Sequence, residues 1–351
     1  MDKTPAALGF HMPAEWEPHQ ATWIAWPHQR ADWPKKFGPI PSVYIEIVRH
    51  LHASEQVHIL VNSARGEDSA RSALQRTKLD WKRISLHHIP TDRVWTRDYG
   101  PGFVKSAAGD IAAVCWRFNG WAKYPNCKRD ARISRKIADL LAVHSWRSEK
   151  AGRPVVLEGG AIDVNGAGCL LTTEECLLSD VQERNPGLSR EDYECLFADY
   201  LGVRKVLWLG RGIAGDDTHG HIDDLARFVS PRTVVICVEN NTSDPNYEPL
   251  QENLRRLRNM TDADGQRLDV VPLPMPEPIW FDGQRLPASY ANFYIANERV
   301  LVPTFNDPND RVALGILADL FPGRAILGIH AVDLVWGLGT LHCLTQQQPA
   351  T

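Results

Sequence analysis

Residues 204–238 read RKVLWLGRGIAGDDTHGHIDDLARFVSPRTVVICV. Two apolar runs in this stretch, KVLWL from Lys205 and TVVICV from Thr233, are rich in Val, Ile and Leu, as short buried strands are. Residues 154–172 hold a similar series of strand candidates without an intervening helical pattern. Both stretches are therefore too rich in strands for a simple alternation of one strand with one helix.

Further strand candidates recur along the whole chain and do not cluster in one half. They are VHILV from residue 57, ISLHHI from 84, IAAVCW from 111, PVVLE from 154, LDVVPL from 268, VLVPTF from 300 and AILGIH from 325. Apolar spacing of three and four residues predicts helices near 41–52, 66–76, 128–142, 189–201, 246–259 and 309–320. This order favours the α/β class, and a unit of one helix with several strands, used about five times, fits the count.

The chain has 351 residues, of which 43% are hydrophobic and 23% charged, a composition typical of a globular protein with a large core. Length alone is compatible with about two domains. No stretch has the composition of an interdomain linker. The proline-rich segment VVPLPMPEPIW at 270–280 comes closest, and we interpret it as a loop that crosses the molecular surface. We therefore expect one domain over residues 1–351.

Charge and hydropathy exclude several classes of partner. Lys and Arg number 39 and Asp and Glu 43, so the formal net charge is −4 and no basic surface for nucleic acid is expected. Apolar runs stop well short of the roughly 20 residues that span a bilayer, and the first residues lack the pattern of a signal peptide. We expect a soluble, cytoplasmic protein that binds neither nucleic acid nor membrane.

Seven cysteines occur, an odd number with no pair at CxxC spacing, which disfavours a thiolate zinc site and a disulfide framework. Most lie in apolar text, such as Cys115 in AAVCW and Cys237 in VVICV, and are expected to behave as small hydrophobic side chains. Cys343 differs, because it follows Gly337 and Gly339 and shortly precedes a polar TQQQ run. It is our candidate nucleophile.

Four short segments combine glycine and a polar, reactive side chain directly after apolar text. They are VWTRDYGPG at 94–102, LEGG at 157–160, GDDTHGHIDD at 215–224 and WGLGTLHCLTQQQP at 336–349. The first three supply Asp98, Glu158 and Asp223. A surface ion pair or a tight glycine turn is the alternative explanation for the first two.

The third of these segments also has the composition of a metal site. His219, His221 and Asp223 would share one face of a strand and so could hold a metal ion together. No second cluster of histidine or cysteine completes such a shell, and the fourth segment carries a nucleophile that needs no metal. The metal site is the weaker alternative.

A cysteine nucleophile requires an acid or base partner, normally a histidine, and His221 is the candidate. Several carboxylates around a thiolate make little sense unless the substrate is itself a cation. A guanidinium fits them, since it is planar and presents five N–H donors to carboxylate oxygens. The set therefore predicts attack of a thiolate on a guanidinium carbon, and its members are Cys343, His221, Asp98, Glu158 and Asp223.

In wording and order these segments resemble the agmatine deiminase and bacterial peptidylarginine deiminase family, which are guanidine-modifying enzymes with the pentein fold. The similarity covers nearly the whole chain. It comprises MPAEWEPH at 12–19, WTRDYGP at 95–101, EGG at 158–160, GHID at 220–223 and HC at 342–343 with the following glutamines. The resemblance implies a five-bladed α/β propeller of pseudo-fivefold symmetry, formed as a single pentein catalytic domain with the active site at its centre.

The resemblance also implies roles for the site residues. Cys343 would be the nucleophile, His221 the general acid and base, and Glu158 the acid that orients His221. The residues expected to bind the substrate are Asp98, Asp223, Trp95 and Asn292. No metal and no organic cofactor is implied, and the expected partners are a small cationic guanidine and, in a homodimer, a second copy of the chain.

The family usually reads GGGNIHC before the nucleophile, whereas residues 337–343 read GLGTLHC. Leu338 and Thr340 are expected to border the pocket, which leaves the deiminase chemistry intact but bears on the substrate. We expect agmatine, converted to N-carbamoylputrescine and ammonia in polyamine and arginine metabolism. The alternatives are deimination of peptidyl or free arginine or of another alkylguanidine, an amidinotransferase, a silent guanidine-binding protein, and a metallohydrolase built on His219 and His221.

Overall fold

The computed structural model describes residues 3–351 and holds five β-sheets of three or four strands, with two short hairpins besides. In four of the sheets an antiparallel pair of strands is followed by a helix and by a third strand that runs parallel to the second. The α/β class predicted from the sequence is confirmed. The five units that the strand and helix count suggested correspond to these five sheets.

The sheet β21-β2-β3-β4 consists of β21 (Gln346–Pro349), β2 (His19–Ala25), β3 (Gln56–Val61) and β4 (Ile84–His88), with helices α1 (Ile40–Leu51) and α2 (Ala64–Leu74). The sheet β1-β5-β6-β7 consists of β1 (Phe10–His11), β5 (Gly102–Ser106), β6 (Ile111–Cys115) and β7 (Ser145–Arg147), with α4 (Ile133–Leu140). The sheet β10-β11-β12 consists of β10 (Asp163–Val164), β11 (Cys169–Thr173) and β12 (Lys205–Leu209), with α5 (Glu174–Leu178) and α6 (Arg190–Leu201).

The remaining strands form two further sheets and two hairpins. The sheet β13-β14-β15 consists of β13 (Ala226–Phe228), β14 (Thr233–Val238) and β15 (Asp269–Pro274), with α7 (Tyr247–Arg258). The sheet β18-β19-β20 consists of β18 (Tyr294–Ile295), β19 (Arg299–Thr304) and β20 (Ala325–His330), with α8 (Pro308–Leu320). The hairpins are β8 (Glu149–Lys150) with β9 (Arg153–Pro154) and β16 (Trp280–Phe281) with β17 (Gln284–Arg285).

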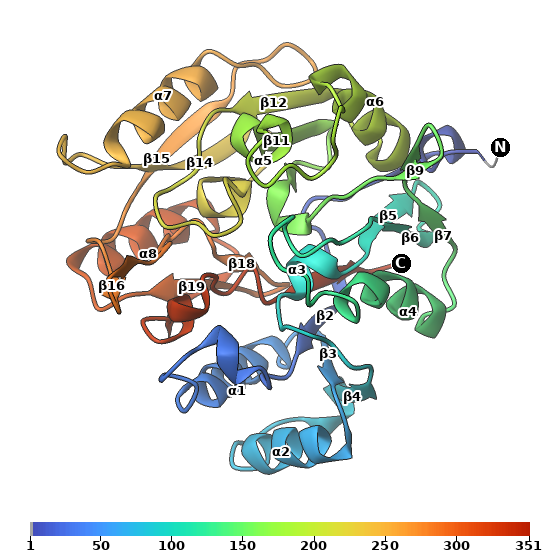
Figure 1. The fold of residues 1–351 in the computed structure, drawn as a ribbon, viewed down its shortest axis with the longest axis vertical. Helices are drawn as coiled ribbons and strands as arrows, with labels where there is room; N and C mark the ends of the chain where they lie inside the picture. The colour runs from blue at the N-terminus through green and yellow to red at the C-terminus, as the bar shows by residue number, and fades with distance from the viewer. Residues whose placement is uncertain (1–2) are drawn as a thin grey trace.

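The longer helices lie towards the outside of the molecule, whereas the short helix α3 (Thr96–Tyr99) lies near the middle of the view in Figure 1. The sequence of α1 explains why such a helix packs on its sheet. Its buried residues, Ile40, Val43, Tyr44, Ile47, Val48 and Leu51, recur at spacings of three and four and so form one apolar face. Burial of one large apolar side chain contributes about 1.5–3 kcal/mol, and this face therefore outweighs the weak intrinsic preference of a short helix.

The sheet that contains β2 is completed by a strand from the other end of the chain. β2 pairs in parallel with β3 and in antiparallel with β21, so that Thr22 lies opposite Gln347. This sheet therefore has the antiparallel and parallel neighbours of the other four, although its antiparallel partner comes from the far end of the sequence. The pairing also places the segment that holds Cys343, which directly precedes β21, beside β2 and α3.

All six predicted helices form, and all but one of the predicted strands do. The exception is PVVLE from residue 154, where only Pro154 belongs to a strand and Val156 makes an isolated bridge to Arg117. That prediction is wrong because Val155, Val156 and Leu157 bury their side chains without forming a strand; their backbone is irregular and leads to Glu158. Within 270–280, β15 extends to Pro274 and β16 begins at Trp280, so only residues 275–279 are a loop. The edge position of β15 explains why it accepts prolines.

Among residues 3–351 there is no helix with the length and apolar character needed to span a membrane. This agrees with the short apolar runs of the sequence. All seven cysteines are free thiols, as the lack of paired spacing predicted.

Candidate active site

A cavity of about 220 Å³ brings together three of the predicted residues, Trp95, Asp98 and Cys343. Trp95 and Asp98 come from the start and middle of α3, and Cys343 comes from the turns before β21. Other side chains on the cavity include Asp32, Arg93, Trp121, Tyr124, Asp217 and Leu338. The remaining predicted residues are buried and are not part of the cavity lining; they are His221, Glu158, Asp223 and Asn292.

Cys343 is 6% exposed, and its thiol has two polar neighbours. Asn292 donates from Nδ2 to the Cys343 sulfur at 3.2 Å, and the thiol donates to Oδ2 of Asp223 at 3.6 Å. Burial raises the pKa of Cys343 well above its ordinary value, and nearby carboxylates, first that of Asp223, raise it further. A cation bound among these carboxylates would oppose their effect and favour the thiolate.

Asp98 presents its carboxylate to the cavity from α3. Its Oδ2 accepts from the indole N–H of Trp121 at 2.9 Å, and its Oδ1 accepts from the backbone N–H of Gly160 at 3.1 Å. Burial raises the pKa of Asp98 to about 6, although the nearby His221 acts in the opposite direction. Gly160 is required here, because a Cβ at that position would lie 2.8 Å from Oδ1 of Asp98 and 2.6 Å from Nδ1 of His221.

The imidazole of His221 lies among three carboxylates. Its Nδ1 is 3.8 Å from Asp98 and 3.9 Å from Asp223, and its Nε2 is 3.9 Å from Glu158. Burial lowers the pKa of this histidine, but the negative charges, first that of Asp98, outweigh burial and raise it well above the ordinary value. The ring is therefore held as a cation that can give up a proton, which is the state that a general acid needs.

Glu158 is fully buried between two cationic side chains, those of Arg184 and His221. Its Oε1 accepts from Nε of Arg184 at 3.1 Å, while its Oε2 faces His221. Burial alone would raise the pKa of Glu158, but Arg184 and then His221 lower it to about 2. The carboxylate is therefore ionised, and its free oxygen is directed at the imidazole.

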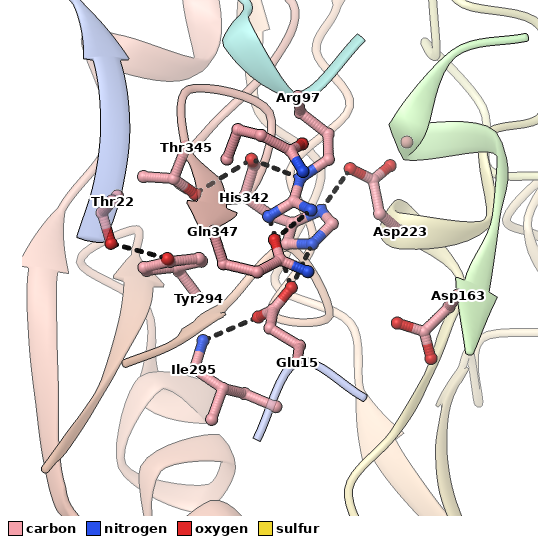
Figure 2. A network of polar contacts seen from close by, with 12 residues as sticks. Glu15, Thr22, Arg97, Asp163, Asp223, Tyr294, Ile295, His342, Thr345 and Gln347 are labelled. Carbon is pink, nitrogen blue, oxygen red and sulfur yellow. Dashed lines mark hydrogen bonds and ion pairs between the residues drawn. The ribbon is translucent and has the colours of Figure 1, made fainter. Parts of the chain in front are cut away.

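Asp223 belongs to a buried network of charged side chains that Figure 2 shows from close by. Its Oδ2 is 2.7 Å from Nδ1 of His342, and Nε2 of that histidine is 2.8 Å from Oε2 of Glu15. The bond to His342 lowers the pKa of Asp223 despite the opposing effect of burial. One face of the Asp223 carboxylate is thereby held, while its Oδ1 has no hydrogen-bond partner among residues 3–351.

Glu15 is the common acceptor of this network. It lies 3.3 Å from Nη2 of Arg97 and 3.0 Å from Nη2 of Arg227, and its Oε1 accepts from the backbone N–H of Ile295 at 2.8 Å. Burial opposes its ionisation, but Arg227 and His342 hold the pKa of Glu15 well below its ordinary value. A residue of the N-terminal segment thus fixes the orientation of the histidine next to Cys343.

Asn292, predicted to bind the substrate, uses its side chain on protein groups instead. Its Nδ2 donates to Asp224 at 2.9 Å as well as to Cys343, and its Oδ1 accepts from the hydroxyl of Thr340 at 2.7 Å and from the backbone N–H of His342 at 3.0 Å. Asn292 is fully buried and does not line the cavity. Its contacts position the turn that carries the thiol.

The departures from GGGNIHC lie in two different places. Leu338 lines the cavity as expected, with a positive φ of 67°. Thr340 is 1% exposed and does not line the cavity, so the expectation that it borders the pocket is wrong. The physical reason is its hydrogen bond to Asn292, which turns its hydroxyl into the protein. Gly339 permits the close approach of Trp95, since a Cβ there would lie 2.8 Å from the indole.

The histidine pair His219 and His221 does not form the metal site that was the weaker alternative. The segment is a series of turns rather than a strand, and His219 has a positive φ of 65° and points its Nε2 to the hydroxyl of Ser179 at 3.1 Å. The two histidines therefore do not share a face. Among residues 3–351, His219, His221 and Asp223 do not form a group whose ligand atoms lie close enough together to hold a metal ion.

Several residues of the site escaped the sequence reasoning. Glu15 lies in a segment that only the family resemblance picks out, His342 lies beside Cys343 in the segment at 336–349 but has no predicted role, and Arg184 lies in neither. Glu15 stands between two apolar residues in a polar, proline-rich segment. Such a position is found for buried and for exposed carboxylates alike, so the sequence could not predict the burial of Glu15. Asp217 was inside the 215–224 segment but had no assigned role; it lines the cavity and accepts from the hydroxyl of Tyr124 at 2.7 Å.

Comparison with known families gives one match over almost the whole chain. The profile of the Porphyromonas-type peptidyl-arginine deiminase family matches residues 11–349. Among individual proteins, the agmatine deiminase of Ectopseudomonas mendocina is 36% identical over 370 aligned residues, which cover 99% of this chain and 97% of the relative. The agmatine deiminase of Pseudomonas aeruginosa strain LESB58 is also 36% identical, with the same coverage.

Solved structures give the same picture. The agmatine deiminase of Enterococcus faecalis superposes with a TM-score of 0.91 at 35% identity, covering 100% of this chain and 98% of its own. A substrate-bound agmatine deiminase of C. jejuni superposes with a TM-score of 0.85 at 27% identity, covering 97% and 96%. An amidinotransferase from Microseira wollei has a TM-score of 0.51 at 12% identity over 97% of both chains, and that similarity concerns the fold alone.

Proposed function

Because the chain belongs to the Porphyromonas-type peptidyl-arginine deiminase family, we propose that it hydrolyses a guanidinium group, with agmatine as the substrate and N-carbamoylputrescine and ammonia as the products. One observation carries this proposal. The Cys343 thiol and the Asp98 carboxylate line the same cavity, and Asp223 contacts that thiol. This arrangement suits attack on the carbon of a bound cation.

In the proposed reaction the guanidinium lies against Asp98 and Asp223, and its charge favours the thiolate of Cys343. The sulfur forms a bond to the guanidinium carbon and gives a tetrahedral adduct. His221 donates its proton to the departing nitrogen, the C–N bond breaks, and ammonia leaves an S-alkylthiouronium on the enzyme. The neutral His221 then takes a proton from water, which attacks the same carbon; the C–S bond breaks, and the ureido product is released.

The buried residues around this centre have positioning roles in the proposal. Glu158, held by Arg184, supports the protonated form of His221 through its free oxygen. Asn292 holds the sulfur of Cys343 by the 3.2 Å contact of its amide. The substrate-binding role expected for Asn292 is thus replaced by one that acts through the nucleophile, while Trp95 keeps its place on the cavity.

We further propose that the five sheets form the five blades of a pentein propeller around this centre and that residues 1–351 make one catalytic domain. Support comes from the shared order of strands and helix in the sheets and from the pairing of β2 with β21. The cytoplasmic location, the lack of a metal or organic cofactor and the homodimer stay predictions. Analytical ultracentrifugation checks the last of these, and a purely monomeric species would contradict it.

The charges on the cavity favour agmatine over arginine. The lining holds the carboxylates of Asp32, Asp98 and Asp217. Asp32 is paired at 2.5 Å with Arg93, the one guanidinium among the described lining residues, and Asp217 is paired at 2.5 Å with Lys123. Agmatine carries two positive charges that such a lining attracts. Arginine would bring an α-carboxylate with no free cation to receive it, and an unpaired buried charge costs several kcal/mol.

We therefore expect kcat/KM for agmatine to exceed that for free or blocked arginine by on the order of a thousandfold. The measurement is release of ammonia and of ureido product from each compound under the same conditions. Turnover of arginine or blocked arginine at the rate of agmatine would contradict the agmatine assignment and leave the chemistry at Cys343 standing. Ammonia without an equal amount of ureido product would indicate transfer to an acceptor other than water.

The pH dependence of the reaction should report Asp98. Its carboxylate has a pKa of about 6 in the protein, so it is ionised above that pH and neutral below it. Agmatine remains cationic throughout this range. We expect kcat/KM to fall as pH decreases through about 6, by about tenfold for each further pH unit, because a neutral Asp98 no longer attracts the guanidinium. A flat profile down to pH 5, in protein that circular dichroism shows to be folded, would contradict the role of Asp98.

A further inference from the structure

Glu158, Cys176 and His221 form a cluster of three chemically different side chains beside the proposed catalytic centre. One potential ligand atom of each, a carboxylate oxygen, the thiol sulfur and an imidazole nitrogen, lies within 4.8 Å of the other two. Cys176 is 1% exposed, and the other two are equally buried. The proposed reaction uses Glu158 and His221 but gives Cys176 no task.

Several polar atoms of the cluster are unpartnered. Oε2 of Glu158 and both ring nitrogens of His221 have no hydrogen-bond partner among residues 3–351. The Glu158 carboxylate is fixed through its other oxygen by Arg184, so Oε2 is left directed at Nε2 of His221, 3.9 Å away. A buried polar atom without a partner is costly, and such atoms in a native protein indicate a missing ligand or a reactive role.

Cys176 is held rigidly at the same place. It lies on α5, where its backbone N–H donates to the hydroxyl of Thr173, the residue that caps the helix, at 3.0 Å. A thiol on a capped helix, an immobilised carboxylate and an imidazole thus converge from three separate segments of the chain. Zinc is commonly bound by thiolate sulfur, imidazole nitrogen and carboxylate oxygen, with bond lengths of about 2.0–2.3 Å.

We propose that Glu158, Cys176 and His221 bind a zinc ion, and that this ion inhibits the enzyme. On binding, the Cys176 thiol and the His221 imidazolium each lose one proton to solvent, and the thiolate and the Glu158 carboxylate balance the two charges of the metal. The ligand atoms need only a small inward movement from their present separations to reach bonding distance. The metal takes up Oε2 of Glu158 and a ring nitrogen of His221, which have no hydrogen-bond partner among residues 3–351, and it replaces the 3.9 Å ion pair between them.

The inhibitory effect rests on the proposed function. A metal-bound His221 can neither protonate the leaving nitrogen nor take a proton from water. The cavity and its lining carboxylate Asp98 are untouched, because none of the three ligands lines the cavity. Zinc is therefore expected to lower kcat much more than it raises KM. Zinc bound to Cys343 inside the cavity would compete with the substrate and raise KM instead.

A zinc titration of agmatine turnover tests the inhibition. The variants are Cys176→Ala and, as a matched control, Cys237→Ala, which removes another buried thiol whose neighbours are Ser289 and a backbone carbonyl. With each rate divided by the same protein's metal-free rate, we expect the half-inhibiting zinc concentration to rise at least tenfold in Cys176→Ala and to stay the same in the control. Restoration of activity by a chelator is expected for the wild type. Equal sensitivity of wild type and Cys176→Ala would overturn the proposal.

Cobalt binding tests the site without any use of activity. The Cys343→Ala variant should show the near-ultraviolet absorption of a cobalt–thiolate bond, and the double variant with Cys176→Ala should lose it. Absence of the band in Cys343→Ala would overturn the metal site even if the deiminase function is correct. Should the alanine variant fail to fold, as judged by its circular dichroism, Cys176→Ser provides the second test, since a serine hydroxyl keeps the volume but does not give the band.

Discussion

Replacement of Cys343 by alanine is expected to reduce turnover of agmatine by at least about ten-thousandfold while the protein remains folded. The sulfur is the only protein group in the proposed reaction that forms a bond to the substrate carbon, and loss of a nucleophile typically costs this much or more. Stability should change little, because the raised pKa keeps the Cys343 thiol neutral in the free protein, so alanine removes no charge from among the surrounding acids. Measurement of kcat and of the thermal midpoint for the wild type and the variant checks both expectations.

Two further observations make this prediction specific. Alanine at Cys195, an exposed cysteine that does not line the cavity, serves as the control and should leave turnover unchanged. Mass spectrometry of wild-type protein quenched during turnover should show the added mass on the peptide that contains Cys343. An adduct on a different cysteine, or substantial activity in Cys343→Ala, would refute the assignment of the nucleophile.

Replacement of Asp98 by asparagine is expected to lower kcat/KM by about a hundredfold to several thousandfold, through a higher KM as well as a lower kcat. Truncating one side of a buried charged pair typically costs 2–5 kcal/mol. The amide also places a donor where the carboxylate now receives the N–H groups of Trp121 and Gly160, so two donors would face each other. Steady-state kinetics with agmatine gives both parameters.

The same variant has a second readout that a merely structural role would not change. The Asp98 charge contributes to the raised pKa of Cys343, so Asp98→Asn should shift the pH profile of thiol alkylation at Cys343 to lower pH. Asp110→Asn, at an exposed carboxylate outside the cavity, is the control and should change neither kinetics nor alkylation. An unchanged alkylation profile in Asp98→Asn would show that the carboxylate does not act on the nucleophile.

The sequence was informative where one side chain has one dominant physical property. Runs of Val, Ile and Leu predicted β14 and β19, and apolar spacing predicted α1, because burial of these faces outweighs other local effects. Prediction failed at PVVLE, where the same apolar content packs as irregular backbone against the site. It also missed β2, because its sequence HQATWIA mixes polar and apolar residues and lacks a clear strand pattern. The polar Thr22 is nevertheless buried, since its hydroxyl forms a hydrogen bond with Tyr294.

For the candidate site, the sequence pointed to Cys343, Asp98 and His221. In the structure His221 lies 3.8 Å from Asp98, and both His221 and Cys343 contact Asp223. The sequence could not separate residues that face the cavity from those that hold them. Thr340 and Asn292 were expected near the substrate, yet they bond to each other. That distinction depends on contacts between segments about 50 residues apart, and no local pattern carries it.

The pairing of β2 with β21 has a consequence for folding of the protein during its synthesis on the ribosome. Synthesis runs from β2 towards β21, so every acid of the site is made before Cys343 and its neighbouring strand emerge. Until then the edge of β2 that will receive β21 is unpaired, and a free strand edge can recruit strands of other chains. Only molecules in which β21 has paired with β2 are therefore expected to be active. A growing chain cannot yet act on guanidines, and its unpaired β2 edge is at that stage most in need of protection by chaperones.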